Sequence, residues 1–128
     1  MLAEESPADV YLFREALKAH DVRHELLVFE DGEAMLNFLQ AAGCDRPRPQ
    51  LFVLDLNLPK IDGLTLLTQV RAMERFAHAR VIILTSSDNP ADRDAATEHG
   101  ADCYIRKAAT IAEFLDIGRV IKAMLAEP

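Results

Sequence analysis

Short, almost wholly apolar runs alternate with longer amphipathic stretches along this chain, and that order restricts its possible folds more than any other feature. Strands that are apolar at nearly every position are buried on both faces, which requires a parallel sheet covered by helices on each side. Because crossovers between parallel strands are right-handed, the pattern predicts an α/β fold with a doubly wound five-stranded sheet in a three-layer sandwich. The predicted strands lie within Met1–Ala3, Val22–Phe29, Leu51–Leu56, Arg80–Leu84 and Asp102–Arg106.

The segments between these runs carry apolar residues at helical spacing. The clearest start is Ser6, an N-cap candidate, with Pro7 at the first helical position and Asp9 three residues after the cap. This helix is expected to run towards His20. The other predicted helices run from Asp31-Gly32 to Gly43, over Leu64–Phe76, over Pro90–His99 with a stop at Gly100, and over Thr110–Leu125.

The length and the net charge of the chain limit the number of domains and the kinds of partner that it can have. The 128 residues contain no linker or repeat, so we expect one domain over 1–128. A formal net charge of −7 argues against nucleic acid and anionic membrane partners. The apolar runs are too short to span a bilayer, and Glu4 and Glu5 interrupt the first of them, which argues against a secretory signal. Cys44 and Cys103 have no CxxC or histidine partner, so we expect unpaired thiols and a cytoplasmic protein.

Polar residues follow four of the five predicted strands. In doubly wound sheets, ligands bind beyond the carboxyl ends of the strands, so these residues are expected to converge on one edge. The convergent groups are two or three carboxylates, a hydroxyl and an ammonium. They belong to Glu4-Glu5 after the first strand, Asp55 after the third, Thr85-Ser86 after the fourth and Lys107 after the fifth.

This combination of groups indicates phosphoryl transfer. Clustered carboxylates need a cation to neutralise them, and hard oxygen ligands suit Mg²⁺. The carboxylate of Asp55 can act as a nucleophile and form an acyl phosphate, while Thr85 and Lys107 can hold the oxygens of the transferring group. Taken singly, each residue has a plainer explanation as a turn, cap or surface residue. Their joint placement on separate strand ends favours the functional interpretation.

The motifs around these residues resemble the receiver domains of two-component response regulators, the CheY-like family, over essentially the whole chain. The resemblance implies a flavodoxin-like sheet with the strand order 2-1-3-4-5. The spacings between Asp55, Thr85 and Lys107 agree with those of the family. The motifs are Glu4-Glu5-Ser6-Pro7, Leu54-Asp55-Leu56-Asn57-Leu58-Pro59 with Asp62-Gly63, Leu84-Thr85-Ser86, and Tyr104 with Lys107.

The resemblance also implies a role for each acidic residue. Asp55 would be the phosphoacceptor, attacking a phosphohistidine on a sensor histidine kinase. Glu5, Asp55 and the main-chain carbonyl of Asn57 would bind Mg²⁺, with Glu4 acting through water. The protein would catalyse only its own phosphorylation and dephosphorylation.

Three further residues would hold and report the phosphoryl group. Lys107 would bridge to the phosphoryl oxygens, Thr85 would bond them and shift inward, and Tyr104 would rotate into the space that Thr85 leaves. The readout surface would comprise the fourth helix, fifth strand and fifth helix, which regulators of this kind also use to form homodimers. The downstream protein partner is not specified by the sequence.

The runs Leu54–Pro59 with Asp62-Gly63, and Ser6–Val10 near the start, look especially like stand-alone regulators that pair with phytochrome-type histidine kinases. No DNA-binding output domain is expected, because the chain ends soon after its last predicted helix.

The sequence departs from the family pattern at three places. Glu5 stands where the second acid is normally aspartate, and Mg²⁺ tolerates little change in ligand geometry. Ala108 stands where a proline normally forms a cis peptide, and a non-proline cis bond costs about 2.5–4 kcal/mol. Only about three residues precede Glu4, so the first strand is expected to be short or to continue a longer chain.

Two alternatives stay open at this point. A phosphorylation-deficient pseudo-receiver, acting as a protein-interaction module, would explain Glu5 and Ala108. A haloacid-dehalogenase-type phosphohydrolase also uses a strand-end aspartate nucleophile, but it needs a second aspartate two residues later as general acid and base. Asn57 stands at that position.

Overall fold

The computed structural model describes residues 1–22, 24–41, 49–107 and 110–126. The predicted helix end at Gly43, the thiol of Cys44 and the peptide at Ala108 lie outside these residues. All five predicted strands form one parallel sheet in the order β2-β1-β3-β4-β5, as the resemblance implied. Their bounds are Leu2–Ala3 for β1, Val28–Phe29 for β2, Leu51–Leu54 for β3, Arg80–Thr85 for β4 and Cys103–Arg106 for β5.

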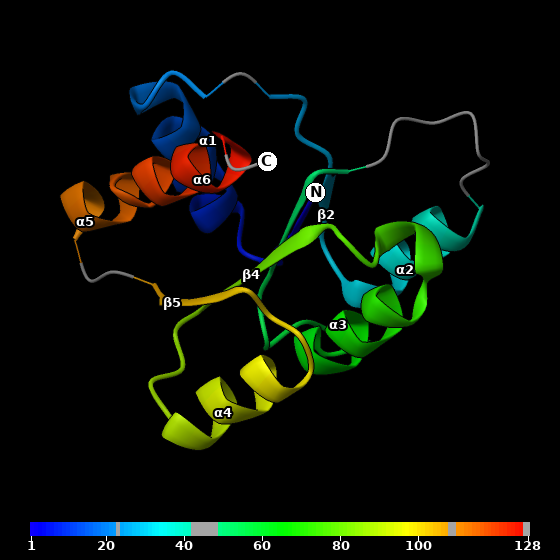
Figure 1. Cartoon of the computed structure of the whole chain (residues 1–128). Coiled ribbons are helices and arrows are strands. Elements are labelled where there is room, and N and C mark those ends of the chain that lie inside the picture. Colours follow the sequence, from blue (N-terminus) through cyan, green and yellow to red (C-terminus); the bar gives the residue numbers. More distant parts are fainter. Residues whose placement is uncertain (23, 42–48, 108–109, 127–128) are drawn as a thin grey trace.

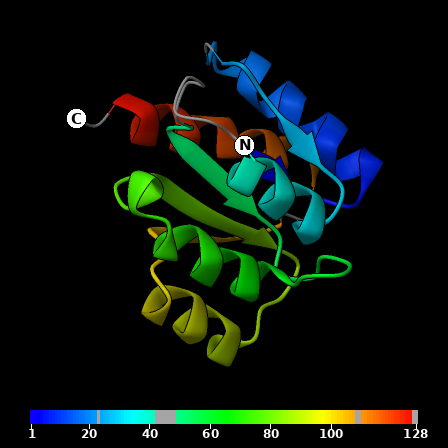
Figure 2. The ribbon, with the colours of Figure 1, turned by 90° about the vertical axis from the view of Figure 1, so that its right-hand side faces the viewer.

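Helices cover both faces of this sheet and complete the predicted three-layer sandwich (Figure 1). On one face lie α1 (Pro7–Ala19), α5 (Ile111–Leu115) and α6 (Ile117–Ala126). On the other lie α2 (Gly32–Ala41), α3 (Gly63–Ala72) and α4 (Pro90–Glu98), as the turned view in Figure 2 also shows. No helix in the described part of the chain is both long and apolar enough to cross a membrane.

Two apolar clusters, one on each face of the sheet, form the core. On β3, Phe52 and Leu54 point into the cluster beneath α2 and α3. Leu51 and Val53 point into the opposite cluster, beneath α1 and α6. Successive side chains of a strand point to opposite faces, so a sheet with two buried faces needs apolar residues at every position. This explains the continuous apolar runs in the sequence.

The first strand is short but central. The Leu2 amide donates to Leu27 and the Glu4 amide donates to Phe29, at 2.9 Å each. On its other side, the Asp55 amide donates to the Ala3 carbonyl at 3.1 Å. The predicted strand over Val22–Phe29 is therefore much shorter in the structure, because β1 offers partners only to the end of that segment.

Two predicted helices are interrupted. The helix predicted over Leu64–Phe76 ends at Ala72, and a 3-10 turn, η1 (Glu74–Phe76), follows the extended Met73. This turn carries Phe76 into the core, where its ring meets that of Phe52 edge-on at 5.5 Å. The helix predicted over Thr110–Leu125 is divided at Asp116 into α5 and α6. The predicted stop at Gly100 is confirmed, with a φ of 103°.

Candidate functional site

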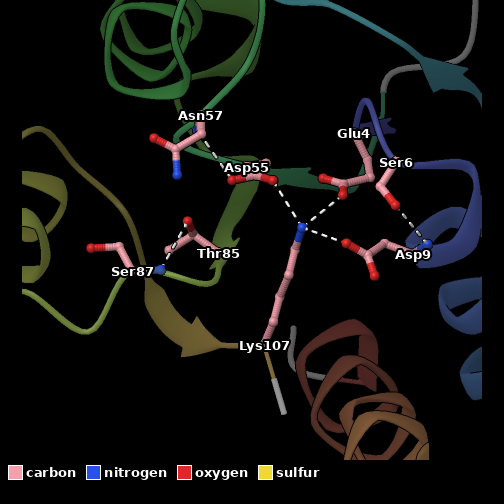
Figure 3. Close-up of polar contacts among 8 residues, drawn as sticks. All are labelled: Glu4, Ser6, Asp9, Asp55, Asn57, Thr85, Ser87 and Lys107. Carbon is pink, nitrogen blue, oxygen red and sulfur yellow. Dashed lines mark hydrogen bonds and ion pairs between the residues drawn. The ribbon is translucent and has the colours of Figure 1, made fainter. Parts of the chain in front are cut away.

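The ammonium of Lys107 lies among three carboxylates at the carboxyl edge of the sheet (Figure 3). Its Nζ is 2.7 Å from Oε1 of Glu4, 2.7 Å from Oδ2 of Asp9 and 2.9 Å from Oδ2 of Asp55. All four side chains are largely buried, with exposed fractions of 5% for Glu4, 26% for Asp9, 11% for Asp55 and 13% for Lys107. The predicted convergence of strand ends is therefore present for Glu4, Asp55 and Lys107.

Asp55 is held in place from two directions. The residue directly follows β3, and the amide of Asn57 donates to its Oδ1 at 3.1 Å. The start of α3 packs closely behind it, because a Cβ on Gly63 would lie only 2.0 Å from the Asp55 carbonyl oxygen. Asp62 caps that helix by accepting a hydrogen bond from the Thr65 amide at 2.8 Å. The Asp-Gly pair thus fixes the loop that follows Asp55.

Lys107 and Thr85 are joined through the backbone of neighbouring strands. The Lys107 amide donates to the Thr85 carbonyl at 2.7 Å, just beyond the end of β5. Thr85 is fully buried, and its Oγ1 accepts a hydrogen bond from the Ser87 amide at 3.4 Å. The Thr85 hydroxyl thus lies at the same edge of the sheet as Asp55, but its hydrogen bond is to Ser87, in the loop that follows β4.

Burial and neighbouring charge shift the proton affinities of this cluster. Burial, followed by the proximity of Asp55, raises the pKa of Glu4 to about 8. Burial alone would also raise the pKa of Asp55, but Glu4, Lys107 and the Asn57 amide outweigh it and hold that pKa below its usual value. Burial would lower the pKa of Lys107, yet its three carboxylate partners raise it above its ordinary value. The lysine therefore carries its positive charge.

Of the predicted metal-binding residues, Glu5 lies apart from this cluster, and Asn57 contacts it only through the main chain. The side chain of Glu5 is exposed, whereas that of Glu4 points inward. Asn57 contacts Asp55 through its main-chain amide, and its side chain points away from Lys107 (Figure 3). Within the described residues, no three histidine, cysteine or acidic side chains are arranged to hold a metal ion together. The assignment of Mg²⁺ ligands stays a prediction.

Sequence reasoning missed Asp9 as a member of the site and assigned it to helix capping alone. The structure supports half of that assignment, because Ser6 Oγ accepts from the Asp9 amide at 3.3 Å. The Asp9 carboxylate, however, reaches Lys107. The available clue was its position in the first turn of a helix that begins directly after β1, since this places it at the ligand-binding edge.

Tyr104, the predicted switch residue, contacts the loop that follows β4. Its hydroxyl donates to the Ser87 carbonyl at 3.0 Å. The guanidinium carbon of Arg93, on α4, lies 5.1 Å from the centre of the tyrosine ring. Because the Ser87 amide also donates to Thr85, a single residue connects the buried hydroxyl with the tyrosine. The two predicted switch residues are thus linked through one loop.

Comparison with known proteins defines the class to which this fold and site belong. The family model of the response regulator receiver domain matches residues 1–118. The chain belongs to this family, and it is a phosphoacceptor signalling protein. Family membership also decides against the haloacid-dehalogenase alternative.

Among its relatives, response regulator Rcp1 of Synechocystis sp. is 36% identical over 129 residues, which cover 99% of this chain and 88% of Rcp1. The crystal structure of the Mn²⁺-bound form of Rcp1 matches with a TM-score of 0.86, covering 98% of this chain and 92% of that chain. The phosphorylated cyanobacterial phytochrome response regulator RcpA matches with a TM-score of 0.88 at 31% identity, covering 98% and 91%. Bacteriophytochrome response regulator RtBRR matches with a TM-score of 0.80 at 30% identity, covering 99% and 76%.

Proposed function

We propose that Asp55 is the residue of this receiver that accepts a phosphoryl group, and that a phosphohistidine of a sensor histidine kinase donates it. The observation that carries the proposal is the 2.9 Å contact between Asp55 Oδ2 and the buried ammonium of Lys107. In the reaction, a carboxylate oxygen of Asp55 forms a bond to phosphorus as the phosphorus–nitrogen bond breaks, and the histidine ring leaves with the electron pair. Lys107 is placed to donate a hydrogen bond to the transferring group.

The oxygen-donor chemistry of the residues around Asp55 suits a small divalent cation. Three carboxylates share one ammonium, and carboxylate and carbonyl oxygens are the ligands that Mg²⁺ prefers. We assign Mg²⁺ to Asp55, Glu4, Glu5 and the main-chain carbonyl of Asn57, and the Mn²⁺-bound form of Rcp1 supports a divalent cation here. Bound Mg²⁺ would neutralise negative charge on the phosphoryl oxygens.

The relatives also support a type of kinase. RcpA is a phytochrome response regulator, and RtBRR is a bacteriophytochrome response regulator. We therefore propose a phytochrome-type histidine kinase as the phosphoryl donor.

The link between Thr85 and Tyr104 supports a mechanism for the output. When the Thr85 hydroxyl turns to a phosphoryl oxygen, the Ser87 amide loses its acceptor, and the loop that holds Tyr104 is released. Tyr104 lies on β5, beside α4, so the change reaches the face formed by α4, β5 and the last helices. We propose this face as the output surface and as the contact of a homodimer.

Phosphorylation is tested with the purified chain, acetyl phosphate and Mg²⁺. We expect a mass increase of about 80 Da, one added phosphoryl group. The increase should be absent in Asp55→Asn and unchanged in Asp94→Asn, which alters an exposed acid on α4. A wild-type chain with no adduct and no response to beryllofluoride would refute the proposal and favour a pseudo-receiver.

A further inference from the structure

Asp9 contacts the ammonium of Lys107 as closely as Glu4 does, at 2.7 Å. We propose that Asp9 is a positioning residue that holds Lys107 in place for phosphoryl transfer to Asp55. The proposal rests on the function proposed above for this site, and it extends that function to a residue on α1.

The first step of the argument is the number of donors. A lysine ammonium carries three N–H groups and no acceptor. In this structure the three groups have three partners, Glu4, Asp9 and Asp55, so the position and the rotation of the ammonium are both fixed. When Asp55 reacts, the donor that points towards it is the one that can turn to a phosphoryl oxygen. Glu4 and Asp9 keep the other two donors.

The second step is the rigidity of Asp9 itself. Ser6 caps α1 through the Asp9 amide, and Pro7 restricts the backbone at the first helical position. The first turn of α1 therefore presents the Asp9 carboxylate from a fixed backbone. Lys107, in contrast, has a long side chain with four rotatable bonds and needs external contacts to keep one orientation.

The third step is the partner that the Asp9 carboxylate contacts. An acidic side chain at this position of a helix often reaches back to the amide of the capping residue. Here the carboxylate crosses from α1 to the end of β5. Because Glu4, at the end of β1, approaches the same ammonium, two neighbouring segments of the chain hold Lys107 together.

The first experiment measures the rate of phosphorylation against the concentration of acetyl phosphate, at saturating Mg²⁺. In this reaction the bond between phosphorus and the acetate oxygen breaks, acetate leaves with the electron pair, and Asp55 gains the phosphoryl group. We expect Asp9→Asn to lower the limiting rate about tenfold, as the loss of one charge-assisted hydrogen bond in the transition state would. The concentration of acetyl phosphate for half-maximal rate should change little.

The matched control separates positioning from helix stability. Ala8 is exposed in the same first turn, so the double variant Ala8→Asp/Asp9→Asn keeps the charge at the start of α1 but moves it away from Lys107. We expect this variant to melt like the wild type and to remain slow. Asp9→Glu should regain part of the rate. A normal rate in Asp9→Asn, or full recovery in the double variant, would overturn the proposal.

A spectroscopic readout tests the contact without phosphorylation. In metal-free buffer, the side-chain ammonium of Lys107 should give a protected ¹H–¹⁵N correlation, which Lys107→Arg identifies by its loss. Asp9→Asn should weaken or shift that signal, whereas Glu5→Gln should leave it in place. An unchanged signal in Asp9→Asn would refute the positioning role. A wild-type chain that is not phosphorylated would refute the proposed function, and the spectrum would still test the contact.

Discussion

At the scale of single residues, the site depends on burying more negative than positive charge in one place. Three carboxylates meet one ammonium, and the most buried of the three, Glu4, is also the one whose pKa is raised. Burial opposes ionisation, and Asp55 adds repulsion. The same arrangement keeps Asp55 ionised, and an ionised carboxylate is the form that can attack phosphorus.

This arrangement predicts a pH-dependent stability in metal-free buffer. The pKa of Glu4 is about 8 in the folded chain and lies near 4.5 when the carboxyl is unperturbed. Between these values the folded state holds a proton that the unfolded state has lost. The free energy of unfolding should therefore fall as pH rises from 4.5 to 8. We expect this contribution to total at most about 5 kcal/mol, the value that corresponds to the full shift of the Glu4 pKa.

Urea denaturation in EDTA at several pH values measures the contribution. Glu4→Gln cannot ionise, so its stability should vary less with pH across this window. Glu5→Gln is the matched control, because it changes the adjacent exposed acid and should keep the wild-type slope. An equally steep slope in Glu4→Gln would contradict the assignment.

At the scale of elements, small residues allow backbones to approach where the site needs it. Both Asp-Gly pairs begin helices, and each glycine faces the backbone of another segment. A Cβ on Gly32 would lie 2.3 Å from the carbonyl oxygen of Ile61, in the loop after β3. Gly63 approaches Asp55 in the same way. The starts of α2 and α3 therefore both support the loop that follows Asp55.

A third glycine sets the packing of α6 on α1. A Cβ on Gly118 would lie 2.1 Å from the Ala16 carbonyl oxygen and 2.8 Å from the ring of His20. Gly118→Ala would improve helix propensity by about 1 kcal/mol. We nevertheless expect a net loss of about 1–3 kcal/mol in the free energy of unfolding, because the helices must move apart.

Chemical denaturation of Gly118→Ala beside Lys122→Ala, a substitution at an exposed position of the same helix, measures this loss. The second variant should differ from the wild type by no more than about 0.5 kcal/mol. A Gly118→Ala chain as stable as the wild type would show that the helices can separate without cost.

At the scale of the whole molecule, one sheet separates two apolar clusters and belongs to both. Ile82 and Ile83 are adjacent on β4 and fully buried, and they point into opposite clusters. Because the strands are common to both clusters, we expect the domain to unfold in one cooperative transition.

Two matched substitutions test this cooperativity. Ile82→Val and Ile83→Val should each lower the free energy of unfolding by about 0.5–1.5 kcal/mol. Circular dichroism and intrinsic tyrosine fluorescence should report the same shifted midpoint in each variant. Midpoints that separate between the probes, or a second transition in one variant, would show that the two faces unfold independently.

The order of the elements, the class of fold and the edge of the sheet that carries the site can all be predicted from the amino-acid sequence. These three features follow from patterns among residues that are close together in the sequence. Continuous apolar runs such as Leu51–Leu54 need burial on both faces, and the ends of parallel strands share one edge, so Asp55 and Lys107 had to meet.

Which side chains lie at that edge depends on packing between distant segments, so it becomes visible only in the folded chain. Glu4 and Glu5 are adjacent in sequence and alike in chemistry, but neighbouring residues of an extended chain point to opposite sides, and Glu4 alone is buried. The contact of Asp9 with Lys107 joins residues 98 positions apart. This contact depends on how α1 packs beside the sheet. Helix-capping preferences are local, so they cannot predict a contact between residues so far apart in the sequence. Pairing with β1 limits β2 to two residues, and the last predicted helix is divided at Asp116.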